Sequence, residues 1–178
     1  MDGPILQTER LTLRPTRAED FAAWADMMGD EQATRFLGGV QPRSTAWRGF
    51  CSMAGAWTLF GFGMFSVIER SSGRWIGRLG PWRPEGWPGS EIGWGLAREA
   101  WGKGYATEGA AAAMDWAFDH LDWTEVIHCI DPDNTPSQAV ARRLGSSNLR
   151  PGAMPAPYDG IPVDIWGQTR EAWRARRS

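Results

Sequence analysis

A glycine-bearing turn at residues 102–104 is the part of this sequence whose residue types and spacing best suit a binding role. A strand-like run precedes it, and a helix-like run begins at Ala106. Glycine lets the backbone come close to a ligand, and N–H groups in the first turn of a helix lack intrahelical acceptors. Consecutive N–H groups from Gly102 to Thr107 can therefore bind a pyrophosphate, with Lys103 as an adjacent cation. The segment predicts an anion site, and a diphosphate fits it.

The spacing of this turn differs from other phosphate-binding loops. A dinucleotide-binding loop needs a third glycine where Thr107 stands, and a nucleoside-triphosphate loop needs a glycine where Ala97 stands. No Gly-x-Ser-x-Gly elbow is present, which argues against a serine hydrolase. A nucleotide-binding protein stays open as one interpretation of the anion site.

The elements around this turn predict a mixed α/β fold. Apolar patterning indicates strands at residues 9–14, 62–69, 75–81, 91–96, 125–130 and 161–169. Helical spacing indicates helices at residues 20–28, 44–56 and 106–121, and a fourth that Asn134 or Thr135 caps and Gly145 ends. We therefore expect one domain over residues 1–178, with a core at 8–169 and a basic tail at 170–178.

Composition narrows the class of protein. The 178 residues are 42% hydrophobic and 22% charged, as in ordinary globular domains, and the net charge of −2 speaks against nucleic-acid binding. The sequence contains no run of about 20 apolar residues, so no membrane span is expected. Its polar start does not resemble a secretion signal, so we expect a cytoplasmic protein. Cys51 and Cys129 are expected to be small buried hydrophobes. His120 and His128 form no metal-ligand spacing with them, so no metal is expected.

Three motifs in order carry a resemblance to a known family. Residues 101–108, WGKGYATE, are similar to the acetyl-CoA-binding motif of GNAT acetyltransferases, and in particular to the branch that acetylates N-terminal alanines of ribosomal proteins. Gly104 and Ala106 match its small residues, while Trp101 stands where Gln or Arg is usual. Residues 133–145 resemble the family's Asn-x-x-Ser helix, and residues 8–15 resemble its first strand. The resemblance spans residues 8–169.

The resemblance implies a fold, a reaction and a cofactor site. It implies a central, mostly antiparallel twisted sheet of about six to seven strands flanked by about four helices. It also implies acetyl transfer from acetyl-CoA, as co-substrate, to a primary amine of a protein N-terminus or a small molecule. The residues that it implies for cofactor binding are Trp94, Gly95, Leu96, Gly102, Lys103, Gly104, Tyr105, Ala106, Thr107, Asn134 and Ser137.

Two side chains are catalytic candidates by this resemblance. Glu91 stands where a family base often lies; the alternative is an ordinary exposed strand residue. Ser137 is the best hydroxyl to hydrogen-bond the leaving thiolate, and Asn134 is expected to orient the cofactor arm; the alternative for both is a helix cap. The glycines of residues 93–95 indicate a bulge whose N–H group stabilises the oxyanion, or simply room for a bulky neighbour.

Two departures from the family pattern keep a second function open. Ser146 follows Gly145 where Phe is usual, and Ala141 stands near the place where many relatives have a tyrosine acid. The missing tyrosine leaves an acyl-CoA-binding module without turnover as the alternative to an active enzyme. The acceptor amine is expected to contact residues 20–60 and 81–89, which do not identify it, and the chain is expected to be a monomer or a homodimer.

Overall fold

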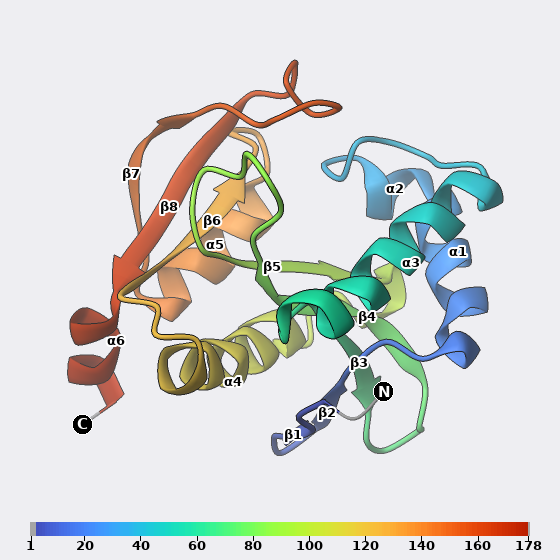
Figure 1. Cartoon of the computed structure of the whole chain (residues 1–178), viewed down its shortest axis with the longest axis horizontal. Helices are drawn as coiled ribbons and strands as arrows, with labels where there is room; N and C mark the ends of the chain where they lie inside the picture. Colours follow the sequence, from blue (N-terminus) through green and yellow to red (C-terminus); the bar gives the residue numbers. More distant parts are fainter. Residues whose placement is uncertain (1–2, 178) are drawn as a thin grey trace.

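One eight-stranded sheet organises the molecule. The computed structural model describes residues 3–177, so the outermost residues of the predicted domain, 1–2 and 178, lie outside the described part. Within residues 3–177 the strand order is β1-β2-β3-β4-β5-β6-β8-β7. Every neighbouring pair is antiparallel except β5 and β6, which are parallel. The strands are β1 (Leu6–Gln7), β2 (Leu11–Arg14), β3 (Phe65–Glu69), β4 (Trp75–Trp82), β5 (Glu91–Leu96), β6 (Glu125–Ile130), β7 (Ser147–Gly152) and β8 (Val163–Thr169) (Figure 1).

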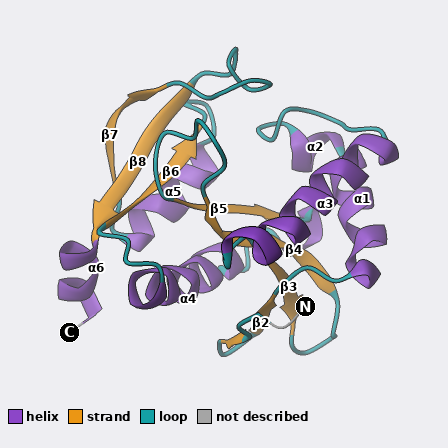
Figure 2. Cartoon of the chain, in the orientation of Figure 1, coloured by secondary structure: helices purple, strands orange, loops and turns teal. Residues whose placement is uncertain are grey.

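The helices pack on the sheet in two main groups (Figure 2). α1 and α3 pack against each other, and α1 also contacts β4. α4 packs against β4 and β5 and contacts α5. No helix within residues 3–177 has the length and apolar character that a bilayer span requires. The helices are α1 (Phe21–Gly29), α2 (Glu31–Thr34), α3 (Arg43–Phe60), α4 (Tyr105–His120), α5 (Thr135–Leu144) and α6 (Arg170–Arg177), with 3-10 turns at Ala18–Asp20 and Arg98–Ala100.

The largest core lies between α4 and the sheet. Ala113 and Met114 of α4 are fully buried and belong to one apolar cluster with Leu11 and Leu79 of the strands. Gly109 allows α4 to approach this closely, because a Cβ atom there would lie 2.5 Å from Leu79 Cδ2. This packing fixes the start of α4, and with it the glycine turn of residues 102–104, against the sheet.

The structure confirms the mixed α/β class and the mostly antiparallel sheet, and it contains more elements than the sequence predicted. The strand expected at 9–14 is β2, which begins at Leu11 because the chain turns just before it, where the Thr8 N–H donates to Leu11 O; the short β1 ahead of that turn was not predicted. The sequence pattern misses β7, because its mostly exposed residues show no apolar alternation and only its pairing with β8 defines it. It also misses α2, a helix of four residues that is capped by the Asp30 carboxylate. The basic tail at 170–177 forms the helix α6.

A buried ion pair joins β2 to the 3-10 turn at Ala18–Asp20. Arg14 of β2 and Asp20 are 8% and 3% exposed, and the guanidinium donates to both carboxylate oxygens at 2.8 and 2.7 Å. Ser66 Oγ and the Arg17 N–H also donate to Asp20. Burial alone would raise the pKa of the Asp20 carboxyl, but these hydrogen bonds outweigh it and lower the pKa.

Removing one partner of this pair should destabilise the fold strongly. We expect Asp20→Asn to lower the free energy of unfolding by about 3–5 kcal/mol, because it leaves the Arg14 charge buried without a counter-ion. Since the folded-state pKa of Asp20 is lowered, its stabilisation in the wild type is present above the ordinary Asp pKa and is lost as pH falls through the folded pKa. Urea unfolding at pH 7 measures the effect. The control Asp26→Asn removes an exposed ion pair of 3.7 Å and should change stability by less than about 1 kcal/mol; equal effects would contradict the prediction.

Candidate active site

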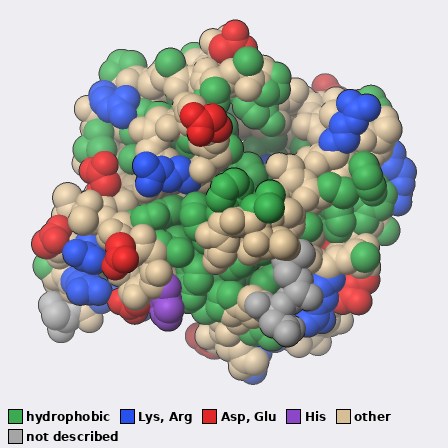
Figure 3. Space-filling view, in the orientation of Figure 1, with side chains coloured by type: hydrophobic (Ala, Val, Ile, Leu, Met, Phe, Trp, Pro, Cys, Tyr) green, Lys and Arg blue, Asp and Glu red, His purple; other side chains and the backbone are tan. Residues whose placement is uncertain are grey.

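A cavity of about 390 Å³ opens where β5 and β6 part. The two strands pair only at Glu91 and Ile127, and beyond this point side chains bind two carbonyl groups of β5: His128 Nδ1 donates to Ile92 O and Trp101 Nε1 donates to Leu96 O. Loops at residues 35–41, 83–90 and 153–162 complete the walls, and Tyr158 of the last loop lies against both Gly38 and Trp87. The space-filling view shows a hollow with apolar side chains at this place (Figure 3).

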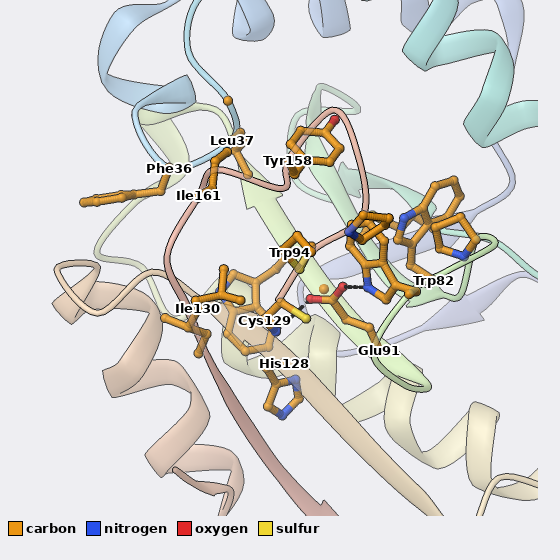
Figure 4. A pocket seen from close by; sticks show the side chains of 18 of the residues that line it. Phe36, Leu37, Trp82, Glu91, Trp94, His128, Cys129, Ile130, Tyr158 and Ile161 are labelled. Atoms are coloured by element: carbon orange, nitrogen blue, oxygen red, sulfur yellow. Dashed lines mark hydrogen bonds between the residues drawn. The ribbon is translucent and has the colours of Figure 1, made fainter. Parts of the chain in front are cut away.

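Glu91 is the buried carboxylate of this cavity. It begins β5, is 6% exposed, and points its carboxylate toward the Cys129 backbone (Figure 4). Trp87 Nε1 donates to one oxygen at 2.5 Å, and the Cys129 N–H donates to the other at 3.0 Å. Burial raises the pKa of Glu91, although both hydrogen bonds act to lower it. The alternative of an exposed strand residue is therefore wrong.

Trp94, Ser137 and Asn134 meet across the gap between β5 and α5, and all three line the cavity. Trp94 Nε1 donates to Ser137 Oγ at 3.2 Å. Asn134 Oδ1 accepts from the Ser137 N–H at 3.2 Å, so Asn134 is the N-cap of α5. Ser137 itself does not cap the helix with its side chain, which leaves its hydroxyl in the cavity wall.

The bulge expected at Gly93–Trp94–Gly95 is absent. The pairing of β5 with β4 runs in continuous register from Glu91 to Leu96, and the register shifts of the described sheet lie elsewhere. The glycines instead make room on the cavity face: a Cβ atom at Gly93 would lie 2.7 Å from Met64 Cε, and one at Gly95 would lie 3.3 Å from Leu37 Cδ1. The geometry therefore supports the alternative that these glycines admit bulky neighbours. Leu96 packs into the core.

The turn before α4 presents a run of unpaired N–H groups. Gly102 and Gly104 have φ values of +73° and +81°, which glycine adopts without strain. Within residues 3–177, none of the N–H groups from Gly102 to Thr107 donates to an acceptor; the first that does is the Glu108 N–H, to Gly104 O. Gly102, Lys103 and Gly104 are exposed. Such a concave run of N–H groups at a helix start is suited to bind an anion.

Neighbouring side chains form hydrogen bonds that stabilise this turn and do not occupy it. Arg10 donates to Lys103 O at 2.8 Å and forms an ion pair with Glu108. Glu108 also accepts from Thr8 at 2.6 Å, so its role is structural. Tyr105 Oη donates to Glu69 at 2.6 Å, which places it in the packing and not in the cavity.

The structure thus separates the predicted residues into two places. Glu91, Trp94, Asn134 and Ser137 line the cavity, whereas the residues from 102 to 107, Ala106 among them, lie at the far end of β5 and begin α4. Sequence reasoning missed Arg78, which also lines the cavity. A lone arginine among the apolar residues of β4 is a signal that could have found it.

Other titratable groups near the site have structural roles. His128 is buried, with Nδ1 2.7 Å from Ile92 O, so Nδ1 carries the proton; burial lowers the pKa to about 4 and the ring is neutral. Burial raises the pKa of the Cys129 thiol. Cys51 is exposed, which corrects the expectation that it is buried. Within residues 3–177, no group of three or more His, Cys, Asp or Glu side chains can hold a metal ion.

Comparisons with known proteins identify the class. Residues 10–147 match the acetyltransferase (GNAT) domain family. An acetyltransferase from Agrobacterium tumefaciens has 32% identity and a TM-score of 0.82, covering 96% of each chain. A GNAT-family acetyltransferase from Bacillus anthracis shares the fold at 22% identity and a TM-score of 0.80, over 94% of this chain and 99% of its own. RimJ of Mycobacterium smegmatis, in complex with CoA-disulfide, shares it at 22% identity and a TM-score of 0.69, over 90% and 82%. A search of curated proteins found no match.

The fold and the family match define an acyltransferase. The chain belongs to the GNAT acetyltransferase family, whose members transfer an acetyl group from acetyl-CoA to an amine.

Proposed function

We propose that this enzyme transfers the acetyl group of acetyl-CoA to a primary amine by direct attack, with Glu91 as the base. The observation that carries the proposal is the run of unpaired N–H groups from Gly102 to Thr107, at the end of the strand that begins with Glu91. Such a run is suited to bind an anion, and coenzyme A carries a pyrophosphate. RimL, a ribosomal L7/L12 alpha-N-protein acetyltransferase that shares the fold at 18% identity and a TM-score of 0.76, makes a protein N-terminus one acceptor class, beside small amines.

The cofactor would extend from this turn into the cavity. The pyrophosphate would bind the N–H groups of residues 102–107, with Lys103 adding positive charge. The arm of coenzyme A would lie along the open side of β5, past Trp94, Gly95 and Leu96, where the strand has no β6 partner. Asn134 at the start of α5 would contact the arm, and the thioester would then lie near Ser137.

The residues of the cavity support each step of the transfer. A primary amine has a pKa of about 10 and must lose a proton to attack. The buried Glu91 carboxylate accepts that proton, directly or through a water, and its raised pKa makes it a better base near neutral pH. The amine nitrogen bonds to the thioester carbonyl carbon, the carbon–sulfur bond breaks, and the coenzyme leaves as a thiolate. The Ser137 hydroxyl can hydrogen-bond that thiolate.

The proposal is tested by binding and turnover with the full chain. Isothermal titration should give heat with acetyl-CoA and none with NAD or ATP, because the turn lacks the glycine spacing of both nucleotide loops. A thiol-release assay over small amines and N-terminal peptides should then find at least one acceptor that speeds thiol release above hydrolysis. Heat with ATP or NAD and none with acetyl-CoA would refute the cofactor assignment. Coenzyme binding without transfer to any amine would support a binding module instead.

A further inference from the structure

Arg78 is a cation in the cavity wall that has no counter-ion. It lies on β4 opposite Gly95 of β5, and its Cζ atom is 3.9 Å from where a Cβ of Gly95 would stand. No Asp or Glu in residues 3–177 lies within 4.0 Å of its guanidinium. Its Nε atom is buried without a hydrogen-bond partner, and its Nη1 atom contacts only the weak acceptor Met64 Sδ, at 2.8 Å.

The same molecule shows how a buried guanidinium is normally satisfied. Arg14 has a bidentate carboxylate partner in Asp20 and a further carboxylate nearby in Glu19. Arg78 faces the ring of Trp24 at 5.3 Å instead, a contact that favours a cation but supplies no hydrogen-bond acceptor. Burial lowers the pKa of Arg78, although the charge of Glu91 acts to raise it. A partly buried guanidinium whose Nε has no acceptor is suited to pair with a ligand carboxylate.

Glu91 acts on the Arg78 charge through space but forms no ion pair with it. Both of its oxygens are engaged by Trp87 and the Cys129 N–H. It pairs with Trp82 across the sheet, whereas Arg78 pairs with Gly95, so the two positions are four residues apart along the strands. The side chains bring the two charged groups closer than this, because Glu91 Oε1 lies 3.4 Å from where a Cβ of Gly93 would stand and Arg78 Cζ lies at Gly95, two residues or about 7 Å further along β5. The Met64 side chain covers Gly93, with Cε 2.7 Å from the same Cβ position. A small acceptor that contacts both charged groups would therefore lie against the Met64 side chain.

We propose that the acceptor is an amino carboxylate, whose carboxylate binds the Arg78 guanidinium while its amine faces Glu91. The walls between these groups are apolar and aromatic, with Trp82, Leu37 and Tyr158 among them. The body of the acceptor is therefore apolar, as in a hydrophobic amino acid or a straight-chain amino acid. This inference rests on the proposed function for the place of the amine, but the carboxylate site itself does not depend on turnover.

The experiment compares carboxylate and carboxamide forms of two probes. In the kinetic assay the acceptor amines are L-phenylalanine and ε-aminocaproate, and each is compared with its primary amide. In the binding assay the acetylated forms of all four compounds are titrated into the protein in the presence of coenzyme A. In at least one pair we expect the carboxylate to have about 10- to 100-fold higher kcat/KM and tighter product binding, as for a hydrogen bond to a charged group. The ratio should fall to about one in Arg78→Met, be partly retained in Arg78→Lys, and be unchanged in Arg83→Met, which alters an exposed arginine on the 83–90 loop.

The results distinguish the carboxylate site at Arg78 from the proposed acetyl transfer. Equal binding and turnover of carboxylate and amide in both pairs, or a preference that survives Arg78→Met, overturns the carboxylate site even if acetyl transfer occurs. Arg78-dependent binding of the carboxylate forms without transfer supports the site and refutes the proposed reaction for these probes. Circular dichroism detects a folding defect in either variant. Because Arg78→Lys keeps the charge, it still tests the carboxylate site if Arg78→Met does not fold.

Discussion

Glu91→Gln lowers kcat/KM for acetyl transfer by about 10²- to 10⁴-fold, the usual contribution of a general base, and leaves the Kd for acetyl-CoA unchanged. Glutamine keeps the shape of the side chain and an oxygen that can accept from Trp87 or the Cys129 N–H, but it cannot take a proton from the amine. Steady-state kinetics and isothermal titration measure the two quantities. Glu125→Gln, at the exposed start of β6, is the matched control and should leave both unchanged.

The pH dependence of the wild type provides an independent check on this base. Burial raises the pKa of Glu91, so the acid limb of the kcat/KM profile should lie above the ordinary Glu pKa of about 4.3. The base must be ionised to act, so the rate falls as pH drops through this raised pKa, and Glu91→Gln should abolish that limb. An acid limb that persists in the variant, or activity near that of the wild type, would show that Glu91 is not the base. Loss of acetyl-CoA binding would instead indicate a structural role.

Gly102→Val weakens coenzyme A binding by about 10- to 100-fold. Gly102 has a φ of +73°, and a β-branched residue there costs about 1–3 kcal/mol in strain or forces the backbone to move. Movement redirects the N–H groups that follow, and these are the groups expected to hold the pyrophosphate. A Cβ atom at Gly102 meets nothing within 4 Å, so the effect would not come from a clash inside the protein. Isothermal titration with coenzyme A measures the change.

The chain offers a closely matched control for this substitution. Gly61 ends α3 with the same φ of +73°, is exposed, and a Cβ atom there would likewise meet nothing within 4 Å. Gly61→Val should therefore lose a similar amount of stability and keep the affinity for coenzyme A. If both variants bind the coenzyme as well as the wild type does, the pyrophosphate does not lie on the turn at residues 102–104.

Local sequence predicted the elements whose signals lie within a few residues. β5 and β6 have the predicted bounds, because each is a short apolar run ended by turn residues. Asn134 caps α5 and Gly145 ends it with a φ of +90°, as their side-chain chemistry implies. β7 and α2 could not be predicted in this way, because one depends on its neighbour β8 and the other is a single capped turn.

The glycine turn was readable from the sequence because its N–H groups are consecutive and their geometry follows from φ values that glycine permits. The cavity was not readable from the sequence, because it is lined by groups that are far apart in the chain. The Glu91 carboxylate is buried by Trp87 from its own loop and by Cys129 from the parallel strand, and Tyr158 completes the wall from a third segment. The exposed position of Cys51 and the unpaired charge of Arg78 likewise depend on which elements pack beside them. The sequence alone determined the glycine turn before α4, where we predict that an anion binds. Only tertiary packing decided which side chains surround the buried carboxylate, because burial and charge pairing arise from contacts between distant segments.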